Sequence, residues 1–278
     1  MRDELDELAR RAAGWGGALG VVAHDLGSGE RVAVGAGRAF TAASVIKLPI
    51  MMTLLSGAEA GRWSLDDRLP LGPEASVGGS GIVKDLVDVP DLSVRDLLTL
   101  MIVLSDNTAT NLLIDLVGLD GVAAWCARNG LRGTVPARRM LDAAARARGE
   151  ENLTTPDDVA ALLAGLARGE LLDGPSTALA LDVLARQQTN DRLPRHLPAG
   201  ARLAHKTGEL VGVRHDAGIV LAEGRAPLVV VALTEAAGPA GAAADAGAGG
   251  PASAEVEERA ADLIAEVGRV VYTATGLI

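Results

Sequence analysis

The sequence has little cysteine, few aromatic residues and no excess of basic charge. Its 278 residues include one cysteine, Cys126, so no intramolecular disulfide can form and thiolates cannot build a metal site. Lys and Arg number 26 against 36 Asp and Glu, a formal net charge of −10. That balance argues against nucleic-acid binding, because neutralising phosphates needs a basic face. No apolar run reaches the ~18 residues of a membrane-spanning helix. We therefore expect no nucleic-acid partner, no membrane partner, and neither a metal nor a cofactor.

The N-terminal segment does not have the composition of a secretion leader. Residues 1–7, MRDELDE, are charged and have no apolar core of the kind found in a secretion leader. We expect a cytoplasmic protein from the chain as it stands, or a secreted or periplasmic protein if the chain is a trimmed mature form. A monomer is expected, because no exposed apolar helix stands out.

The order of predicted elements indicates an α/β (α+β) fold. Segments rich in Val and Leu predict two strands near the N-terminus and three near the C-terminus, whereas apolar helical patterns dominate the middle. Thr155 followed by Pro156 is typical of a helix start. Residues 236–253 are almost all Ala, Gly and Pro, which favours a surface loop. We predict a single domain over 1–278, with one antiparallel sheet built from both chain ends (about 1–40 and 195–278) and a helical lobe (about 41–194).

Three short motifs carry candidate chemistry. Ser44-Val45-Ile46-Lys47 opens an apolar helix, where residues three apart share one face, so the hydroxyl and the amine can meet. Ser105-Asp106-Asn107 links two helices, and its first and third side chains can face one cleft. Lys206-Thr207-Gly208 ends a predicted strand. Each motif taken alone also has a structural explanation: a helix cap with a snorkelling Lys, a helix break, and a strand that ends in a turn.

Together and in this order, the three motifs are the set typical of class A β-lactamases and penicillin-binding proteins. The chain resembles the class A β-lactamases and their serine-hydrolase relatives over nearly its whole length. The resemblance extends to Leu97-Leu98-Thr99-Leu100-Met101-Ile102 before the second motif and to Thr108-Ala109-Thr110-Asn111 after it. It implies a β-lactamase/transpeptidase-like fold and a serine nucleophile.

The resemblance also implies a role for each motif residue. Ser44 would be acylated, Lys47 would be its base, and Ser105 would relay a proton to the leaving nitrogen. Asn107 would hold Lys47 and the substrate amide. A substrate carboxylate would be bound by the third motif. The residues implied in binding that carboxylate are Lys206, Thr207 and Gly208, with Arg214 as a further cation. The oxyanion would be bound by the backbone N–H groups of Ser44 and Glu209.

The omega loop departs from the family pattern. Class A enzymes carry a Glu there that activates the deacylating water, but alignment on Thr134 and Arg138 puts Met140 at that position. Asp142 is the nearest acid, two residues on and one methylene shorter. Asp142 is therefore either a replacement base or a surface acid paired with Arg138 or Arg146. The motif set predicts intact acylation, and Met140 predicts slow deacylation.

The predicted function is thus a serine hydrolase that acylates on Ser44 with a β-lactam, amide or ester, the substrate being a small molecule that carries a carboxylate. Three alternatives remain at this point. One is a cytosolic esterase or acyl-transfer enzyme, and the second is a D,D-peptidase of the penicillin-binding type. The third is a non-catalytic binding protein, against which the intact motifs argue.

Overall fold

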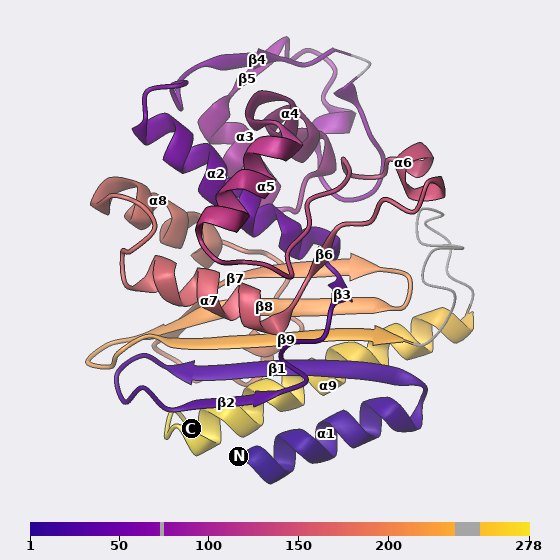
Figure 1. Cartoon of the computed structure of the whole chain (residues 1–278), viewed down its shortest axis with the longest axis vertical. Coiled ribbons are helices and arrows are strands. Elements are labelled where there is room, and N and C mark those ends of the chain that lie inside the picture. The colour runs from indigo at the N-terminus through magenta and orange to yellow at the C-terminus, as the bar shows by residue number, and fades with distance from the viewer. Residues whose placement is uncertain (73–74, 237–250) are drawn as a thin grey trace.

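The centre of the protein is a five-stranded antiparallel sheet with the strand order β2-β1-β9-β8-β7 (Figure 1). The computed structural model describes residues 1–72, 75–236 and 251–278. Two strands come from the start of the chain and three from its end: β1 (Gly17–Asp25), β2 (Arg31–Val34), β7 (Ala201–Leu210), β8 (Val213–Ala222) and β9 (Leu228–Ala236). Strand β1 pairs with β9 along its whole length, which joins the two chain ends. The predicted antiparallel sheet from both ends is confirmed.

Two terminal helices, α1 (Arg2–Gly14) and α9 (Pro251–Ala274), cover one face of this sheet (Figure 1). The alternation of side chains along a strand sends Val230 and Ala232 of β9 into the core on this side, and Val229 and Val231 into the core on the other. A strand buried on both faces reads as a continuous apolar run. This explains the unbroken Leu-Val-Val-Val sequence of β9.

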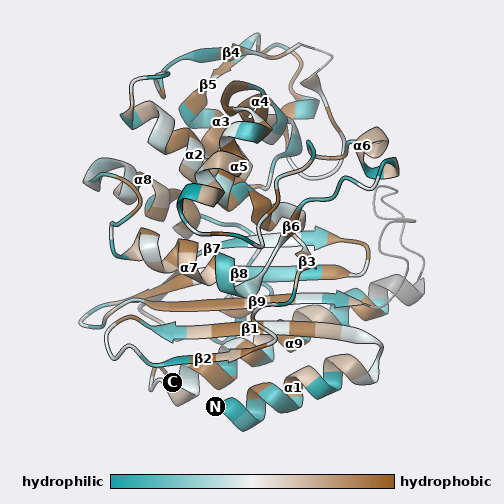
Figure 2. Ribbon diagram, viewed as in Figure 1, coloured by the Kyte–Doolittle hydropathy of each residue, from teal (hydrophilic) through white to brown (hydrophobic). Residues whose placement is uncertain are grey.

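The opposite face carries the helical part of the molecule, in which α2 is central (Figure 1). Helix α2 is buried almost all round and is correspondingly apolar (Figure 2). The elements of this part are η1 (Ala43–Ile46), α2 (Lys47–Glu59), α3 (Val94–Val103), α4 (Asn107–Val117), α5 (Leu119–Arg128), α6 (Ala143–Ala147), α7 (Pro156–Ala167) and α8 (Gly174–Ala185). Shorter elements connect them: β3 (Phe40–Thr41), β4 (Arg68–Pro70), η3 (Val83–Asp85), β5 (Asp91–Ser93), β6 (Leu153–Thr154) and η4 (Leu193–His196).

Side-chain caps fix where several helices begin. The Thr155 hydroxyl accepts from Asp158 N at 3.1 Å, with Pro156 in the first turn of α7, so the predicted helix start is confirmed. Asp106 caps α4 in the same way through Ala109 N at 2.8 Å. Helix α8 begins at Gly174, because Asp173 caps it through Ser176 N at 2.8 Å.

The elements that carry the first and third motifs differ from their prediction. Ser44 lies in the 3₁₀ turn η1, and the α-helix starts only at Lys47. Lys206-Thr207-Gly208 lies inside β7, not at a strand end, because β7 continues to Leu210 in a long hairpin with β8. Of the predicted loop over 236–253, residues 237–250 lie outside the described residues. Whether the chain forms one domain stays a prediction.

Within the described ranges, no single helix is both long and apolar enough to cross a membrane. Helices α4 and α5 meet the length and hydropathy requirement only when taken together, and they are bent by 76° relative to each other.

Candidate active site

The first motif residue, Ser44, lies on a strained turn pressed against β7. Ala43 has a φ of 45°, in the left-handed region that a residue with a Cβ rarely adopts. The turn approaches β7 so closely that a Cβ on Gly208 would lie 3.3 Å from the Ala43 Cβ and 3.2 Å from a ring carbon of His215. The glycine of the third motif therefore lets the nucleophile turn pack on the strand. The Ser44 hydroxyl makes no hydrogen bond to any described residue and is half-buried.

Lys47 is fully buried and ties the first motif to the second. Its Nζ donates to Ser105 Oγ at 3.0 Å, to the Ser105 carbonyl oxygen at 2.6 Å and to Asn107 Oδ1 at 2.9 Å. Burial lowers the pKa of Lys47 well below its usual value, the Lys206 cation lowers it further, and Asp106 partly opposes the shift. A neutral fraction of this amine is therefore accessible, and such an amine can accept a proton.

The second motif is a strained junction between α3 and α4. Ser105 has a φ of 54°. Asp106 points away from Lys47, since its carboxylate accepts from Ile82 N, Val83 N and Ala109 N at 2.7–2.8 Å. Asn107 also donates to Gly78 O at 3.2 Å. Asp106 thus holds the segment at Ile82 and Val83 in place. The Ser105 and Asn107 side chains on either side of it face Lys47, as the spacing predicts.

The third motif supplies a second buried amine. Lys206 is fully buried, and its Nζ donates to Thr207 O at 2.8 Å. Burial lowers the pKa of Lys206 to about 7; Asp216 opposes this shift, whereas the Arg192 cation adds to it. At neutral pH this amine is therefore divided between its charged and neutral forms.

Arg192 is a charged residue of this region that the sequence analysis missed. It is 1% exposed, and its Nη1 donates to His215 O at 2.9 Å and Gly208 O at 3.4 Å. Its Nη2 donates to Glu209 Oε1, so the residue after the third motif is ion-paired to it. A lone Arg before Leu193-Pro194 carries no sequence signal, because burial of an arginine is decided by packing between distant segments.

Arg214, the predicted additional cation, is engaged elsewhere. Its Nη2 pairs with Glu257 of α9, and its Nη1 donates to the carbonyl oxygens of Leu210 and Val213 at 2.9 Å. It lies opposite Glu209 in the β7–β8 pairing. The structure therefore places Arg214 near Glu209, with its guanidinium ion-paired to the terminal helix, and its role toward a carboxylate stays a prediction.

The omega loop holds Met140 in place through its backbone. Asn111 of α4 accepts from Met140 N at 2.8 Å and donates to Met140 O at 3.1 Å, and the Met140 side chain is buried. The next residue, Leu141, has a φ of 57°. This is the fixed position at which the family pattern expects a Glu, and here the side chain cannot accept a proton.

Asp142 belongs to α6. Its Oδ1 accepts from Ala145 N at 2.8 Å, the bond of an N-terminal cap. Arg138, one of the suggested partners of Asp142, instead forms a two-pronged pair with Glu151. Among the described residues, Asp142 makes no hydrogen bond to a residue of the three motifs. The geometry assigns Asp142 a capping role, and a catalytic role stays a prediction.

No group of three or more His, Cys, Asp or Glu side chains in the described ranges is arranged to hold a metal ion. The reactive groups of this region are Ser105 and the two buried amines Lys47 and Lys206, with Ser44 on the turn that packs against β7. Their arrangement suits acyl transfer with proton relay between side chains.

Comparison with known proteins places this geometry in a family. Residues 1–275 match the family described as the β-lactamase enzyme family. A β-lactamase of Amycolatopsis lactamdurans is 29% identical over 274 residues, which cover 97% of this chain and 84% of that protein. The structure of a β-lactamase from Sphaerobacter thermophilus has a TM-score of 0.86 at 32% identity, covering 100% and 99% of the two chains. A mutant of PBP-A, solved as an acyl-enzyme complex with penicillin G, has a TM-score of 0.84 at 29% identity over 100% and 96%. The chain belongs to the β-lactamase enzyme family.

Proposed function

We propose that this protein is a serine enzyme that opens β-lactams by acylation at Ser44 and releases the acyl group slowly. The observation that carries the proposal is the buried Lys47 amine, which is hydrogen-bonded to Ser105 and Asn107 and has a lowered pKa. The serine β-lactamase type agrees with the family and with its relatives. The slow release is inferred from Met140.

In the acylation step, Ser44 Oγ attacks the lactam carbonyl while Lys47 accepts its proton. A tetrahedral oxyanion forms, and the backbone N–H groups of Ser44 and Glu209 are expected to hold it. The carbon–nitrogen bond then breaks, and the proton passes from Lys47 through the Ser105 hydroxyl, 3.0 Å away, to the leaving nitrogen. The product is an ester on Ser44 with a ring-opened amine.

Deacylation requires a water molecule and a base. The residue that the family pattern uses as this base is replaced here by Met140, whose side chain is not a base. General-base assistance contributes about 10²–10⁴-fold to a rate. We therefore infer that hydrolysis of the ester is slower, by about that factor, than it would be with a Glu at position 140.

The substrate is a small molecule recognised as a β-lactam, with its carboxylate near Lys206 and Thr207. The esterase, D,D-peptidase and non-catalytic alternatives share Ser44 or its surroundings, but no contact among the described residues favours one of them over the β-lactam reaction.

The test mixes the protein with a chromogenic cephalosporin and follows intact mass and absorbance together. The expected result is one equivalent of chromophore released in a burst, with a long-lived adduct on Ser44 that is absent in Ser44→Ala. Rapid multiple turnover would overturn only the slow release of the acyl group and would leave acylation at Ser44 standing. Absence of both adduct and turnover would overturn β-lactam recognition itself.

A further inference from the structure

The residue after the third motif brings a carboxylate to the side of the site that is expected to bind a substrate anion. Glu209 follows Thr207 by two residues on β7, so the two side chains lie on the same face of the strand. The Thr207 hydroxyl is expected to contact a substrate carboxylate. The Glu209 side chain is 47% exposed and therefore stands at the opening of this region, not inside the core.

The Glu209 carboxylate is already bound to a buried cation of this region, Arg192. Arg192 is 1% exposed, held by the carbonyl oxygens of Gly208 and His215, and donates its Nη2 to Glu209 Oε1. Arg192 and Arg214 lower the pKa of Glu209 against the opposing effect of its burial, so this carboxylate is charged at neutral pH. A second carboxylate, Asp191, lies 3.5 Å from Arg192 Nε.

Among the described residues, both arginines around the third motif are already ion-paired. The cationic side chains of this region are Arg192 and Arg214, with the two buried amines Lys47 and Lys206 beside them. Four carboxylates are set against them: Asp191 and Glu209 on Arg192, Asp216 near Lys206, and Glu257 on Arg214. Lys206 is in addition only partly charged near pH 7. An incoming carboxylate thus meets two arginines that already have carboxylate partners and one partly charged amine, within a protein of net charge −10.

We propose that Glu209 competes, through its own carboxylate, with a substrate carboxylate on this side of the site, and so lowers the rate of acylation by donors that carry a negative charge there relative to neutral donors. The proposal rests on acylation at Ser44, the function proposed above. A substrate anion has to displace Glu209 from Arg192 or share the cation with it, and two like charges side by side are unfavourable. Glu209 is thereby a specificity-determining residue through its side chain, whereas its backbone N–H serves the oxyanion.

The test compares two acyl donors that differ only in this charge, penicillin G and its methyl ester. The second-order rate constant for adduct formation on Ser44 is measured by quenched intact mass for the wild type and for Glu209→Gln. The expected result is a rise of about tenfold in the ratio of acid to ester in Glu209→Gln, because the amide no longer repels the anion or holds Arg192 as strongly. Using the ratio cancels any change in the folded fraction.

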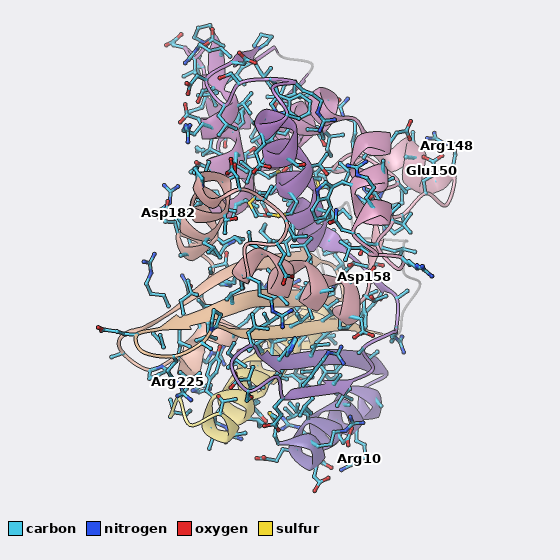
Figure 3. All side chains as sticks on the ribbon, turned by 60° about the vertical axis from the view of Figure 1, so that its left-hand side comes forward. Arg10, Arg148, Glu150, Asp158, Asp182 and Arg225 are labelled. Carbon is cyan, nitrogen blue, oxygen red and sulfur yellow. The ribbon has the colours of Figure 1, made fainter. Side chains whose placement is uncertain are left out.

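Glu150→Gln is the matched control. Glu150 is 41% exposed and pairs with Arg148, so the substitution removes the same formal charge from a similar ion pair. Both residues lie together at the surface beside α6 (Figure 3). The acid-to-ester ratio is expected to stay within about twofold of the wild type, since Glu150 makes no hydrogen bond or ion pair with a described residue of the three motifs. An unchanged ratio in Glu209→Gln, or an equal rise in Glu150→Gln, would overturn the proposal.

A second measurement separates this inference from the proposed function. If neither penicillin nor its ester acylates the wild type, the proposed function fails, and the role of Glu209 is then decided by equilibrium binding of inorganic phosphate. Glu209→Gln is expected to bind phosphate at least about fivefold more tightly than the wild type and Glu150→Gln, because Arg192 is then free to pair with the anion. Equal phosphate affinities in the three proteins would refute an anion position held by Glu209.

Discussion

Lys47 donates two hydrogen bonds to Ser105, from Nζ to the hydroxyl at 3.0 Å and to the carbonyl oxygen at 2.6 Å. The amine is thereby locked to the junction between α3 and α4 and cannot swing away from it. Because the hydroxyl of Ser105 is one of the two acceptors, a proton taken up by Lys47 has a direct route onward. This pairing couples the nucleophile turn to the residue expected to serve the leaving group.

The two buried amines predict a bell-shaped pH profile for acylation by a carboxylate-bearing penicillin. Lys47 must be neutral to accept a proton, so the rate falls as the pH drops through its lowered pKa. Lys206 must be charged to bind the carboxylate, and its pKa is about 7, so the rate also falls as the pH rises above about 7. Burst rates measured on both sides of neutrality check this. With the methyl ester the fall at high pH is expected to disappear, and its persistence would contradict the role given to Lys206.

Replacing Met140 by Glu is expected to speed deacylation. The backbone of residue 140 is fixed on both sides by Asn111, so a carboxylate introduced there is held in one place. We expect the adduct on Ser44 to decay at least about tenfold faster, within the range of general-base catalysis. Adduct lifetime by intact mass is the measurement. Met140→Gln is the control of equal size without a base, and equal lifetimes in both variants would argue against a missing base.

The two roles considered for Asp142, helix cap and catalytic base, predict different effects of substitution. As a cap, it can be replaced by Asn with little loss, whereas Asp142→Ala lowers the free energy of unfolding by about 1 kcal/mol. Urea denaturation of the two variants checks the cap. Adduct lifetimes check the base: we expect Asp142→Asn to match the wild type, and a severalfold longer lifetime in that variant would restore Asp142 as the group that activates water.

Asn111 is expected to be a main support of the omega loop. Asn111→Ala leaves the buried N–H and C=O groups of Met140 without their partners, which lowers the free energy of unfolding by about 2–4 kcal/mol. Asn129→Ala is the control, since that exposed residue makes one side-chain hydrogen bond, to Trp125 O, and the expected change is below about 0.5 kcal/mol. Similar losses in the two variants would contradict the support role.

The sequence by itself determined the strands at the two chain ends and the helical character of the middle, because these follow from local patterns. Six apolar residues in succession identify β9, and Thr155-Pro156 identifies the start of α7. It also determined the composition of the three motifs and the absence of a Glu at position 140, since these are read residue by residue. The ends of elements are less predictable. Ser44 lies in a 3₁₀ turn whose first residue, Ala43, packs against Gly208, a contact between segments far apart in the sequence.

Only the tertiary structure decided how the charged groups are used. Lys47 meets residues 58 and 60 positions away, and its lowered pKa depends on that burial and on Lys206. The ion pair of Arg192 with Glu209 and the bond of Asp142 to Ala145 likewise assign roles that composition cannot distinguish. The physical reason is that local patterns depend on neighbours along the chain, whereas the state and partner of a charge depend on burial and on groups that folding brings close.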